Sequence, residues 1–524
     1  MMWRLLVTGF RLSRYCLLSS NVARMTSVQT KPASTEQATT FDSLDPATDE
    51  VVGTYPINTA LEVTAAVEAA REAAAWWAGL GFAGRAERLR RWKGTITRRS
   101  AQLAEVVHAE TGKPHSDAMI EIVSAIDHLA WAAKNARKVL GQQKRRSGML
   151  MANQSATVEF QPLGVVGVIG PWNYPVFTPL GSITYALAAG NAVVFKPSEY
   201  TPGVGRWLVD TFAEAVPEHP VFQLITGFGE TGAALCRSGV DKLAFTGSPG
   251  TARKIMATCA ETLTPVLIEA GGKDALLVDE DADLDAAADA AVWGGMSNAG
   301  QTCVGVERVY VHEKVYDAFV AKVVAAAGEL RAGSDPEAKI GPITMPAQLK
   351  IIRRHIADAV SRGGRALLGG EDAVGDRYVQ PTVLVDVPED AEAVCEETFG
   401  PTLTIARVAD MDEAVAKAND SRYGLGATVF AKRRGMELAR RLRSGMTAVN
   451  SVISFAAIPS LPFGGIGDSG FGRIHGPEGL KEFTRAKAIA RQRFKPPMLL
   501  TSFGRSAKDD ARVAKLITIL HGKR

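Results

Sequence analysis

The sequence has little cysteine and no long hydrophobic run. Its five cysteines are widely spaced and form neither a CxxC pair nor a cluster with histidine. This pattern indicates neither a disulfide framework nor a metal site, and it fits a reducing compartment. No apolar run is long enough to cross a bilayer, so we expect no transmembrane segment.

The chain also lacks a strong excess of either charge. Its 60 basic and 56 acidic residues leave a net charge of +4, which does not indicate a nucleic-acid partner. Hydrophobic residues make up 46% of the 524 positions. A chain of this length and composition is expected to form two or three domains with large cores.

The beginning of the chain differs from the rest. Residues 1–40 contain four arginines and no acidic residue before Glu36, which resembles an amphipathic transit peptide. A start at Met25 and a disordered extension are the alternatives. We therefore expect a cytoplasmic protein, or a protein of the mitochondrial matrix if this segment is a transit peptide.

Residues 501–524 form a second unusual segment. Four of its apolar side chains share one helical face: Val513, Leu516, Ile517 and Leu520. We expect a short helix packed on its own subunit or on a neighbour. The alternative is a basic amphipathic helix that lies on a membrane surface.

Short apolar runs alternate with helical stretches along much of the chain. Four such runs lie at residues 164–170, 192–195, 221–225 and 243–245. Runs of this kind are typical of buried parallel strands. The alternation predicts a parallel sheet covered on both faces, and its continuation predicts a second α/β domain. A helical pattern at residues 61–109 precedes these four runs.

Cys303 lies in the run Gly300-Gln301-Thr302-Cys303-Val304-Gly305. A thiolate attacks a carbonyl carbon without a metal, and small neighbours allow a substrate to approach closely. The alternative is a buried free cysteine that acts as a small hydrophobic residue.

Two segments that follow predicted strands suit a dinucleotide. Gly247 lets the backbone approach a ligand, and Pro249 suits a helix start whose free N–H groups favour a pyrophosphate. Lys196 and Glu199 can bind ribose hydroxyls, and an acidic group disfavours a 2′-phosphate, so NAD is favoured over NADP. A plain turn and a solvated loop are the alternatives.

Two further residues suit acyl chemistry. Asn173 lies in the loop Pro171-Trp172-Asn173-Tyr174-Pro175, where two prolines hold an amide donor as an oxyanion hole requires. Glu269 precedes Gly271 and Gly272 and is a candidate general base. The alternatives are a structural turn for Asn173 and a helix cap or buried ion pair for Glu269.

The order and spacing of these segments, over about 320 residues, resemble the NAD(P)-dependent aldehyde dehydrogenase superfamily. The matching pieces are PWNYP, KPSE, FTGS, EAGGK, GQTC, EETFGP and PFGG. The resemblance spans residues 41–493 and implies an α/β fold of the aldehyde dehydrogenase type. Such a fold combines a Rossmann-type cofactor domain, an α/β catalytic domain and a small β oligomerisation element.

The resemblance also implies a role for each residue. Cys303 would add to the aldehyde, Asn173 would hold the oxyanion with the N–H of Cys303, and Glu269 would activate water. A thiohemiacetal loses hydride to NAD, and water hydrolyses the resulting thioester to a carboxylic acid. Because free cysteine has a pKa of about 8.5, we expect local lowering of this pKa or assistance by a base. The implied cofactor-binding residues are Trp172, Lys196, Glu199, Gly247, Ser248, Glu397 and Phe399.

The family pattern predicts the domain boundaries and the assembly. The expected NAD-binding domain covers residues 41–146 and 166–269, the oligomerisation strands 147–165 and 485–500, and the catalytic domain 270–484. A hairpin at residues 148–161, with the segment 488–494 as its mate, would pair with a partner's sheet. We therefore expect a homodimer or a homotetramer.

The sequence departs from the family in front of Cys303. Ser182 and Ile474 stand where many members carry the lysine and glutamate of a proton relay, and Gly181 replaces a bulky aromatic residue. We therefore expect a wide substrate funnel. The small or apolar residues expected to line it are Tyr174, Phe177, Gly181, Thr302, Val304 and Phe455.

This lining favours an apolar or aromatic aldehyde, because an anionic substrate would need an arginine beside it. The alternatives are a succinate-semialdehyde dehydrogenase, a CoA-acylating aldehyde dehydrogenase and a catalytically silent nucleotide-binding scaffold. Retention of Glu269 argues against CoA acylation. Retention of Cys303, Asn173 and Glu269 together argues against a silent scaffold.

Overall fold

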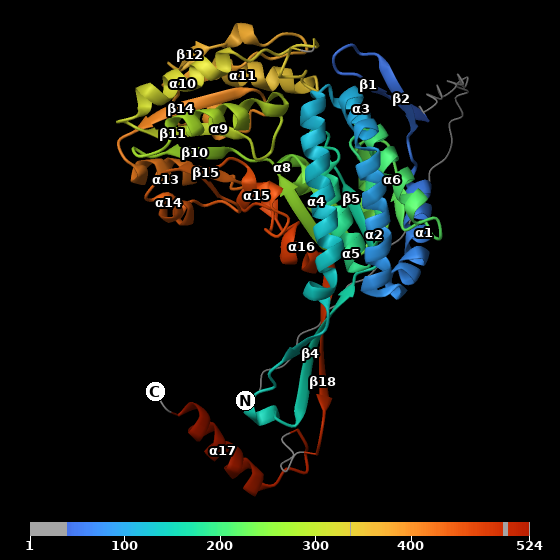
Figure 1. Cartoon of the computed structure of the whole chain (residues 1–524). Helices are drawn as coiled ribbons and strands as arrows, with labels where there is room; N and C mark the ends of the chain where they lie inside the picture. The colour runs from blue at the N-terminus through green and yellow to red at the C-terminus, as the bar shows by residue number, and fades with distance from the viewer. Residues whose placement is uncertain (1–38, 336, 496–500, 523–524) are drawn as a thin grey trace, which may run out of the picture. The chain divides into compact units, whose positions relative to one another are not determined.

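A computed structural model describes residues 39–335, 337–495 and 501–522 (Figure 1). The predicted N-terminal extension therefore lies outside the described residues, except for its last two positions. In the described part of the chain, no helix is long and apolar enough to cross a membrane.

The predicted parallel sheet is present and has six strands. Their order is β17-β9-β8-β5-β6-β7, and every neighbouring pair is parallel except β17 with β9. All residues of β6 are buried, as expected for a strand covered on both faces. The strands are β5 (Val165–Ile169), β6 (Ala192–Lys196), β7 (Phe222–Leu224), β8 (Lys242–Gly247), β9 (Val266–Ala270) and β17 (Gly470–Phe471).

Helices cover this six-stranded sheet. Helices α1, α5, α7 and α8 pack on its strands, and α2 and α4 pack in turn on α5 (Figure 1). The predicted helical segment 61–109 is divided into α1, α2 and α3. The helices are α1 (Ala60–Gly79), α2 (Gly81–Arg98), α3 (Ser100–Thr111), α4 (His115–Leu140), α5 (Phe177–Ala189), α6 (Pro202–Ala215), α7 (Gly229–Arg237) and α8 (Pro249–Ala260).

A second sheet of seven strands follows, in the order β12-β13-β14-β11-β10-β15-β16. All its pairs are parallel except β12 with β13. The strands are β10 (Asp274–Val278), β11 (Val306–His312), β12 (Arg365–Leu368), β13 (Thr382–Val385), β14 (Thr402–Val408), β15 (Ala427–Phe430) and β16 (Ala448–Val449). The helices after β10 are α9 (Leu284–Met296), α10 (Tyr316–Gly328), α11 (Ala347–Ser361), α12 (Glu392–Cys395), α13 (Met411–Asn419), α14 (Gly435–Arg441), α15 (Ser454–Ala457) and α16 (Gly476–Glu482).

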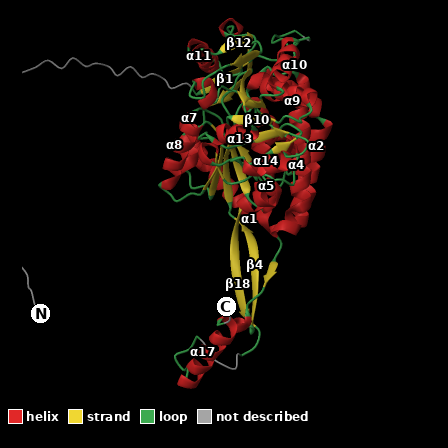
Figure 2. Cartoon of the chain, turned by 90° about the vertical axis from the view of Figure 1, so that its left-hand side faces the viewer, coloured by secondary structure: helices red, strands yellow, loops and turns green. Residues whose placement is uncertain are grey.

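The predicted hairpin belongs to a three-stranded antiparallel sheet. Strand β4 (Gln154–Pro162) pairs along its whole length with β18 (Thr484–Gln492), and β3 (Gln143–Arg145) pairs with the other edge of β4. Figure 2 shows β4 and β18 as two long strands side by side. The expected mate of the hairpin is thus β18 of the same chain. Two short strands, β1 (Thr40–Leu44) and β2 (Val51–Pro56), form a separate hairpin.

The tail contains the helix that its apolar spacing predicts. Helix α17 (Ala507–His521) begins with a capping box, in which Ser506 and Asp509 each bind the other's backbone N–H. None of the residues of α17 is buried. The expected packing of this helix on its own subunit is therefore not seen within the described chain.

Candidate active site

A cavity of about 720 Å³ opens at the carboxyl ends of the six-stranded sheet. This is the place where ligands bind in doubly wound folds. Strand β5 leads into the loop with Asn173, β6 ends at Lys196, and β9 carries Glu269 close to its end. All ten catalytic and cofactor candidates line this cavity: Trp172, Asn173, Lys196, Glu199, Gly247, Ser248, Glu269, Cys303, Glu397 and Phe399.

Helix starts face this cavity. Ser248 caps α8, accepting a hydrogen bond from Thr251 N at 3.3 Å, and Pro249 occupies the first helical position. Gly229 and Gly232 of the first turn of α7 also line the cavity. Free N–H groups at helix starts attract anionic groups, so this wall fits the pyrophosphate of a dinucleotide.

The cavity wall after β6 contains a lysine and a glutamate. Lys196 is buried, and burial lowers the pKa of its ammonium group, which donates to Pro197 O at 3.1 Å. Glu199 lies three residues further on and is half-buried. This pair can hydrogen-bond the two hydroxyls of a ribose.

Glu269 and Cys303 are neighbours in the cavity. Burial raises the pKa of Glu269 to about 7, although contacts with Cys303 and Thr246 oppose this shift. Burial and the nearby Glu269 carboxylate raise the pKa of Cys303 well above its ordinary value. The expectation that the thiol pKa is lowered is therefore wrong for this state of the chain. The other expectation, assistance by a base, has a suitable group in Glu269.

The backbone before Cys303 is strained. Asn298 and Ala299 have positive φ angles of 52° and 56°, and Gly300 follows with φ 69°. A Cβ atom on Gly300 would lie 2.0 Å from the carbonyl oxygen of Gly400, so only glycine fits there. Strain of this kind persists where surrounding contacts enforce it, often at functional sites.

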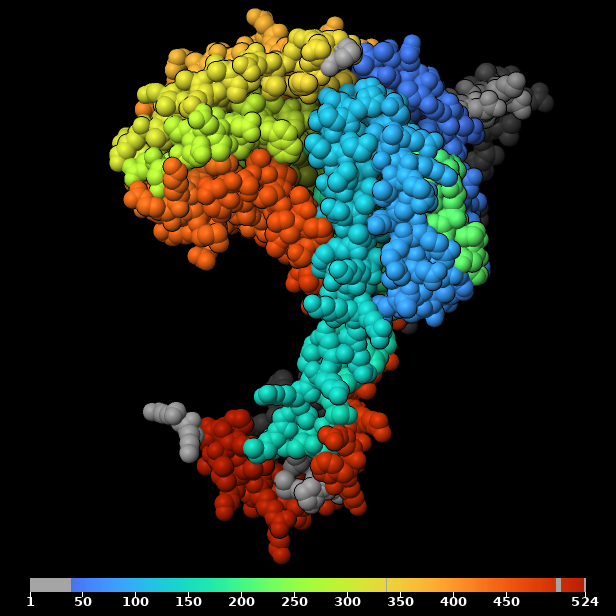
Figure 3. Space-filling view, viewed as in Figure 1, coloured from blue at the N-terminus to red at the C-terminus, as the bar shows by residue number. Residues whose placement is uncertain are grey.

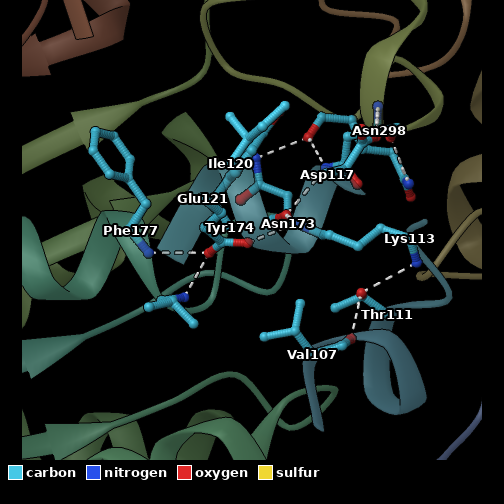
Figure 4. Close-up of polar contacts among 12 residues, drawn as sticks. Val107, Thr111, Lys113, Asp117, Ile120, Glu121, Asn173, Tyr174, Phe177 and Asn298 are labelled. Atoms are coloured by element: carbon cyan, nitrogen blue, oxygen red, sulfur yellow. Dashed lines mark hydrogen bonds and ion pairs between the residues drawn. The ribbon is translucent and has the colours of Figure 1, made fainter. Parts of the chain in front are cut away.

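A buried ion pair supports the Asn173 loop from behind (Figure 4). Lys113 Nζ lies 2.9 Å from Glu121 Oε2, and both side chains are almost fully buried. Glu121 Oε1 accepts from the N–H groups of Val176 and Phe177 at 2.6 and 3.0 Å. Lys113 also donates to Asn173 O at 2.7 Å. The pair therefore fixes the backbone of the loop that contains Asn173.

The same loop is tied to the Cys303 segment. Asn173 Nδ2 donates to Gln301 O at 3.0 Å, and Asn298 Nδ2 donates to Asn173 O at 3.0 Å. The Tyr174 hydroxyl lies 3.0 Å from Thr302 Oγ1. These contacts hold the Asn173 amide close to the nucleophile, and its second N–H stays available to a ligand.

A second buried ion pair supports the Glu397–Phe399 loop. Lys273 pairs with Glu307, whose carboxylate accepts from Thr398 N at 2.9 Å and Phe399 N at 3.0 Å. Glu397 accepts from Gly272 N at 3.0 Å. A Cβ atom on Gly271 would lie 2.0 Å from Glu397. Burial and the nearby Glu307 raise the pKa of Glu397 well above its usual value.

The structure corrects the expectation of a wide funnel at Gly181. A Cβ atom on Gly181 would lie 2.7 Å from His475 Nε2 and 2.9 Å from Ile474 Cδ1. These two side chains therefore fill the space that the missing side chain leaves. Of the other expected funnel residues, Val304 and Phe455 are buried in one hydrophobic cluster, and Phe177 packs against it.

Sequence reasoning assigned no role to the supporting ion pairs. Glu121 lies on α4, a helix beyond the predicted helical segment 61–109, and Glu307 is the second residue of β11, far in sequence from both loops. Both elements carry other charged residues, so the sequence does not distinguish Glu121 or Glu307 from its charged neighbours.

Comparisons with known proteins agree with this architecture. The sequence pattern of the Aldehyde dehydrogenase family matches residues 33–489. A 4,4'-diapolycopene aldehyde oxidase of Methylomonas sp is 36% identical over 85% of this chain and 84% of its own length. A glutarate-semialdehyde dehydrogenase of Pseudomonas aeruginosa is 37% identical over 85% of this chain and 92% of its own length.

Solved structures show the same fold. An NAD-dependent aldehyde dehydrogenase from Sinorhizobium meliloti superposes with a TM-score of 0.84 at 35% identity, covering 88% of this chain and 93% of its own. An NADP dependent enzyme from E. coli superposes with a TM-score of 0.82 at 34% identity, covering 86% and 95%.

Fold and site together define an oxidoreductase that acts on aldehydes. The chain belongs to the aldehyde dehydrogenase family. Members of this family use NAD or NADP, and the solved neighbours include both kinds.

Proposed function

We propose that this enzyme oxidises apolar aldehydes to carboxylic acids and prefers NAD to NADP. The observation that carries the proposal is that Cys303 and Glu269 line the same cavity as Lys196 and Glu199. The thiol supplies the nucleophile, and the carboxylate with a pKa of about 7 can accept a proton near neutral pH.

Each candidate then has a role. Cys303 adds to the aldehyde carbon, and Asn173 Nδ2 with the N–H of Cys303 holds the oxygen that becomes negative. Glu269 takes a proton from the water that hydrolyses the thioester. When bound, the nicotinamide ring accepts the hydride. The residues proposed to hold the cofactor are Trp172, Lys196, Glu199, Gly247, Ser248, Glu397 and Phe399.

The groups around the expected funnel favour an apolar substrate. Desolvation lowers the pKa of His128 to about 4 and the pKa of His475 well below its usual value, so both rings are neutral near pH 7. Lys113 and Lys273 are paired with buried carboxylates. None of these four groups offers a free positive charge to an anionic aldehyde.

Glu199 supports the preference for NAD. A carboxylate beside the adenosine ribose binds its 2′-hydroxyl and repels a 2′-phosphate. Replacement of Glu199 by serine should therefore raise kcat/KM for NADP relative to NAD.

A panel of aldehydes with NAD and NADP in parallel tests the proposal. The absorbance of the reduced cofactor reports turnover, and a panel of hexanal, benzaldehyde, succinate semialdehyde and glutarate semialdehyde separates apolar from anionic substrates. We expect the highest kcat/KM with hexanal or benzaldehyde and NAD. No cofactor reduction with any aldehyde would refute the proposal.

A second candidate is oxidation of a dicarboxylic semialdehyde, which the name of the Pseudomonas aeruginosa relative supports. Higher kcat/KM with succinate or glutarate semialdehyde than with hexanal would favour it. Turnover that requires added coenzyme A would instead indicate the acylating reaction.

We also propose an assembly of several copies and a division of the chain into two functional domains. Strand β18 has one edge that no described strand covers, and β16 ends the seven-stranded sheet in the described chain. Pairing of β18 with β16 of a second copy would give a homodimer or, by repetition, a homotetramer. We assign cofactor binding to the six-stranded sheet and catalysis to the seven-stranded sheet, although β17, from residues 270–484, joins the cofactor sheet.

A further inference from the structure

Two cysteines that the proposed chemistry does not use, Cys236 on α7 and Cys259 on α8, contact each other. Each is only 1% exposed, and their thiols share a hydrogen bond. The two helices pack on each other, and Figure 2 shows them side by side. Their ends are also joined, because Arg237 Nε lies 3.6 Å from Glu261 Oε2. The fold therefore holds the two thiols together.

The active-site cavity extends to this pair of thiols. Its lining includes positions on one face of α7: Gly229, Gly232, Ala233 and Cys236. Its lining also includes positions of α8: Thr251, Lys254, Ile255 and Thr258. The cavity thus continues between the two helices as a slot, here called the α7–α8 slot, and Cys236 lies in the wall of this slot.

The α7–α8 slot begins where the helices begin. Gly229 is the first residue of α7, and Cys236 follows seven residues later, a rise of about 10 Å along the helix. Lys196 lies near the start of the slot, because a Cβ atom on Gly232 would lie 3.6 Å from Lys196 Cδ. Under the proposed function, this start holds the phosphates and the ribose, so the adenine ring lies further along, toward Cys236.

The cavity is the route by which a small reagent can reach the two thiols. On the side of the molecule that Figure 3 shows, α2 and α4 form the surface over the six-stranded sheet, whereas α7 belongs to the layer with α1, on which it packs. Cys236 lines the cavity, and Cys259 lies outside the lining. A reagent that enters the cavity therefore meets Cys236 first, and a bound cofactor would cover it.

Two thiols in contact can form a disulfide when a peroxide oxidises them. The hydrogen bond with Cys236 lowers the pKa of Cys259, which favours a thiolate, the reactive form. An oxygen of the peroxide bonds to one sulfur as the O–O bond breaks, and water leaves. The second sulfur then displaces the hydroxyl group of this sulfenic acid as a second water. The two thiols lose two electrons and two protons, and the peroxide takes up both.

This disulfide would narrow the α7–α8 slot. Bonded sulfur atoms lie about 2 Å apart, which is closer than two thiols in contact, so the bond draws α7 and α8 together. A narrower slot holds a flat ring less well, and the affinity for the cofactor should fall. Because coupling between two events is reciprocal, a bound cofactor should in turn oppose the disulfide.

We propose that Cys236 and Cys259 form a reversible disulfide with peroxide and that this bond weakens binding of the nicotinamide cofactor. The reduced pair is the working state, which a reducing compartment maintains. This inference rests on the proposed function, which places the adenosine half of the cofactor in the α7–α8 slot.

Peroxide treatment of the full-length Cys303→Ala variant tests the proposal, because this variant lacks the proposed nucleophile and keeps both other thiols. Peptide mass spectrometry should find the Cys236 and Cys259 peptides joined, in this variant and in the parent enzyme. Calorimetry should show the Kd for NAD raised about ten-fold, and dithiothreitol should reverse both changes. Absence of the joined peptides, or an unchanged Kd after they form, would overturn the proposal.

A pair of variants separates this disulfide from other oxidation. In the Cys303→Ala background, Cys259→Ser keeps a small polar side chain but cannot form the bond, so peroxide should leave its Kd for NAD unchanged. Cys395→Ser removes an exposed cysteine and should respond to peroxide as the background does. An equal rise of the Kd in both variants would overturn the proposal.

Protection by a bound nucleotide tests the position of the two thiols in the slot. NAD at about ten times its Kd should slow formation of the disulfide about ten-fold, since only the empty enzyme leaves Cys236 uncovered. AMP, which supplies the adenosine half alone, should protect to the same extent at the same multiple of its own Kd. Equal rates with and without bound nucleotide would overturn the proposal.

Binding and turnover separate this proposal from the proposed function. Failure of the reduced parent enzyme to bind NAD, or to oxidise any aldehyde, would refute the proposed function. Normal binding and turnover without a disulfide after peroxide treatment would refute only the role of Cys236 and Cys259.

Discussion

Two buried lysine–glutamate pairs each support one loop that lines the cavity. In both, the glutamate accepts from two successive backbone N–H groups: Glu121 from Val176 and Phe177, and Glu307 from Thr398 and Phe399. The first pair fixes the loop with Asn173, beside the nucleophile. The second fixes the loop with Glu397, beside the proposed nicotinamide ribose. The same arrangement thus supports the loop proposed for the chemistry, here called the Asn173 side, and the loop proposed for the cofactor, here called the Glu397 side.

This difference predicts which kinetic constant each side controls. Disturbing the Asn173 side should lower kcat, because Asn173 is proposed to stabilise charge that develops only in the transition state. Disturbing the Glu397 side should mainly raise KM for the cofactor.

The largest effect, and the clearest separation of catalysis from cofactor binding, is expected for a substitution of Cys303. Cys303→Ala removes the nucleophile, so kcat should fall by at least about a thousand-fold, while the Kd for NAD, measured by calorimetry, stays within about two-fold of the parent value. Cys395→Ala, a change of an exposed cysteine, is the matched control and should leave both constants unchanged. Turnover near the parent rate in Cys303→Ala would refute the nucleophile.

The second largest effect is expected when the ion pair between Lys113 and Glu121 is broken. Lys113→Met leaves the Glu121 carboxylate buried without its cation, which should cost about 3 kcal/mol of the free energy of unfolding and lower kcat about a hundred-fold through misplacement of Asn173. Urea unfolding and steady-state kinetics measure the two effects. Arg91→Met breaks the exposed pair with Glu87 and should cost less than about 1 kcal/mol. Equal losses in the two variants would show that Lys113 has no special role.

The pH dependence of kcat/KM tests the proposed base, Glu269, without involving cofactor binding. Glu269 has a raised pKa of about 7, so it is protonated and cannot act as a base below that pH. We expect kcat/KM for the aldehyde to fall about ten-fold per pH unit below the pKa, with little change in the Kd for NAD. Glu269→Gln should remove this dependence. A parent profile that is flat down to pH 5 would contradict the assignment.

The smallest effect is expected on the cofactor side. Glu307→Gln keeps an acceptor for the N–H groups of Thr398 and Phe399 but leaves Lys273 without its carboxylate. We expect KM for NAD to rise about ten-fold and kcat to change less. Glu437→Gln, at an exposed glutamate, should change neither. A loss of kcat without a change in KM for NAD would contradict the prediction that the Glu397 loop controls cofactor binding.

Much of the fold could be predicted from the sequence, and the reason is physical. Buried parallel strands must be apolar along their whole length, so β5, β6 and β8 are visible as short apolar runs. The ends of these strands carry the unusual residues, which is why all ten catalytic and cofactor candidates line one cavity.

The surroundings of these residues could not be predicted from the sequence. The pKa of Cys303 is raised rather than lowered because the thiol is buried beside a carboxylate. The residues next to Cys303 in the sequence do not reveal this burial. Gly181 suggested an open funnel, but Ile474 and His475, almost three hundred positions later, fill the space beside it.

The sequence by itself determined the family, the order of strands and helices, and the chemical groups available for thiol and base chemistry, since these depend on local pattern and residue type. Only the tertiary structure decided how each group behaves. Burial, and the contacts of the Lys113–Glu121 and Lys273–Glu307 pairs with the loops that they support, arise between segments distant in the sequence. Such contacts control pKa values and positions, because both depend on what surrounds a side chain in space.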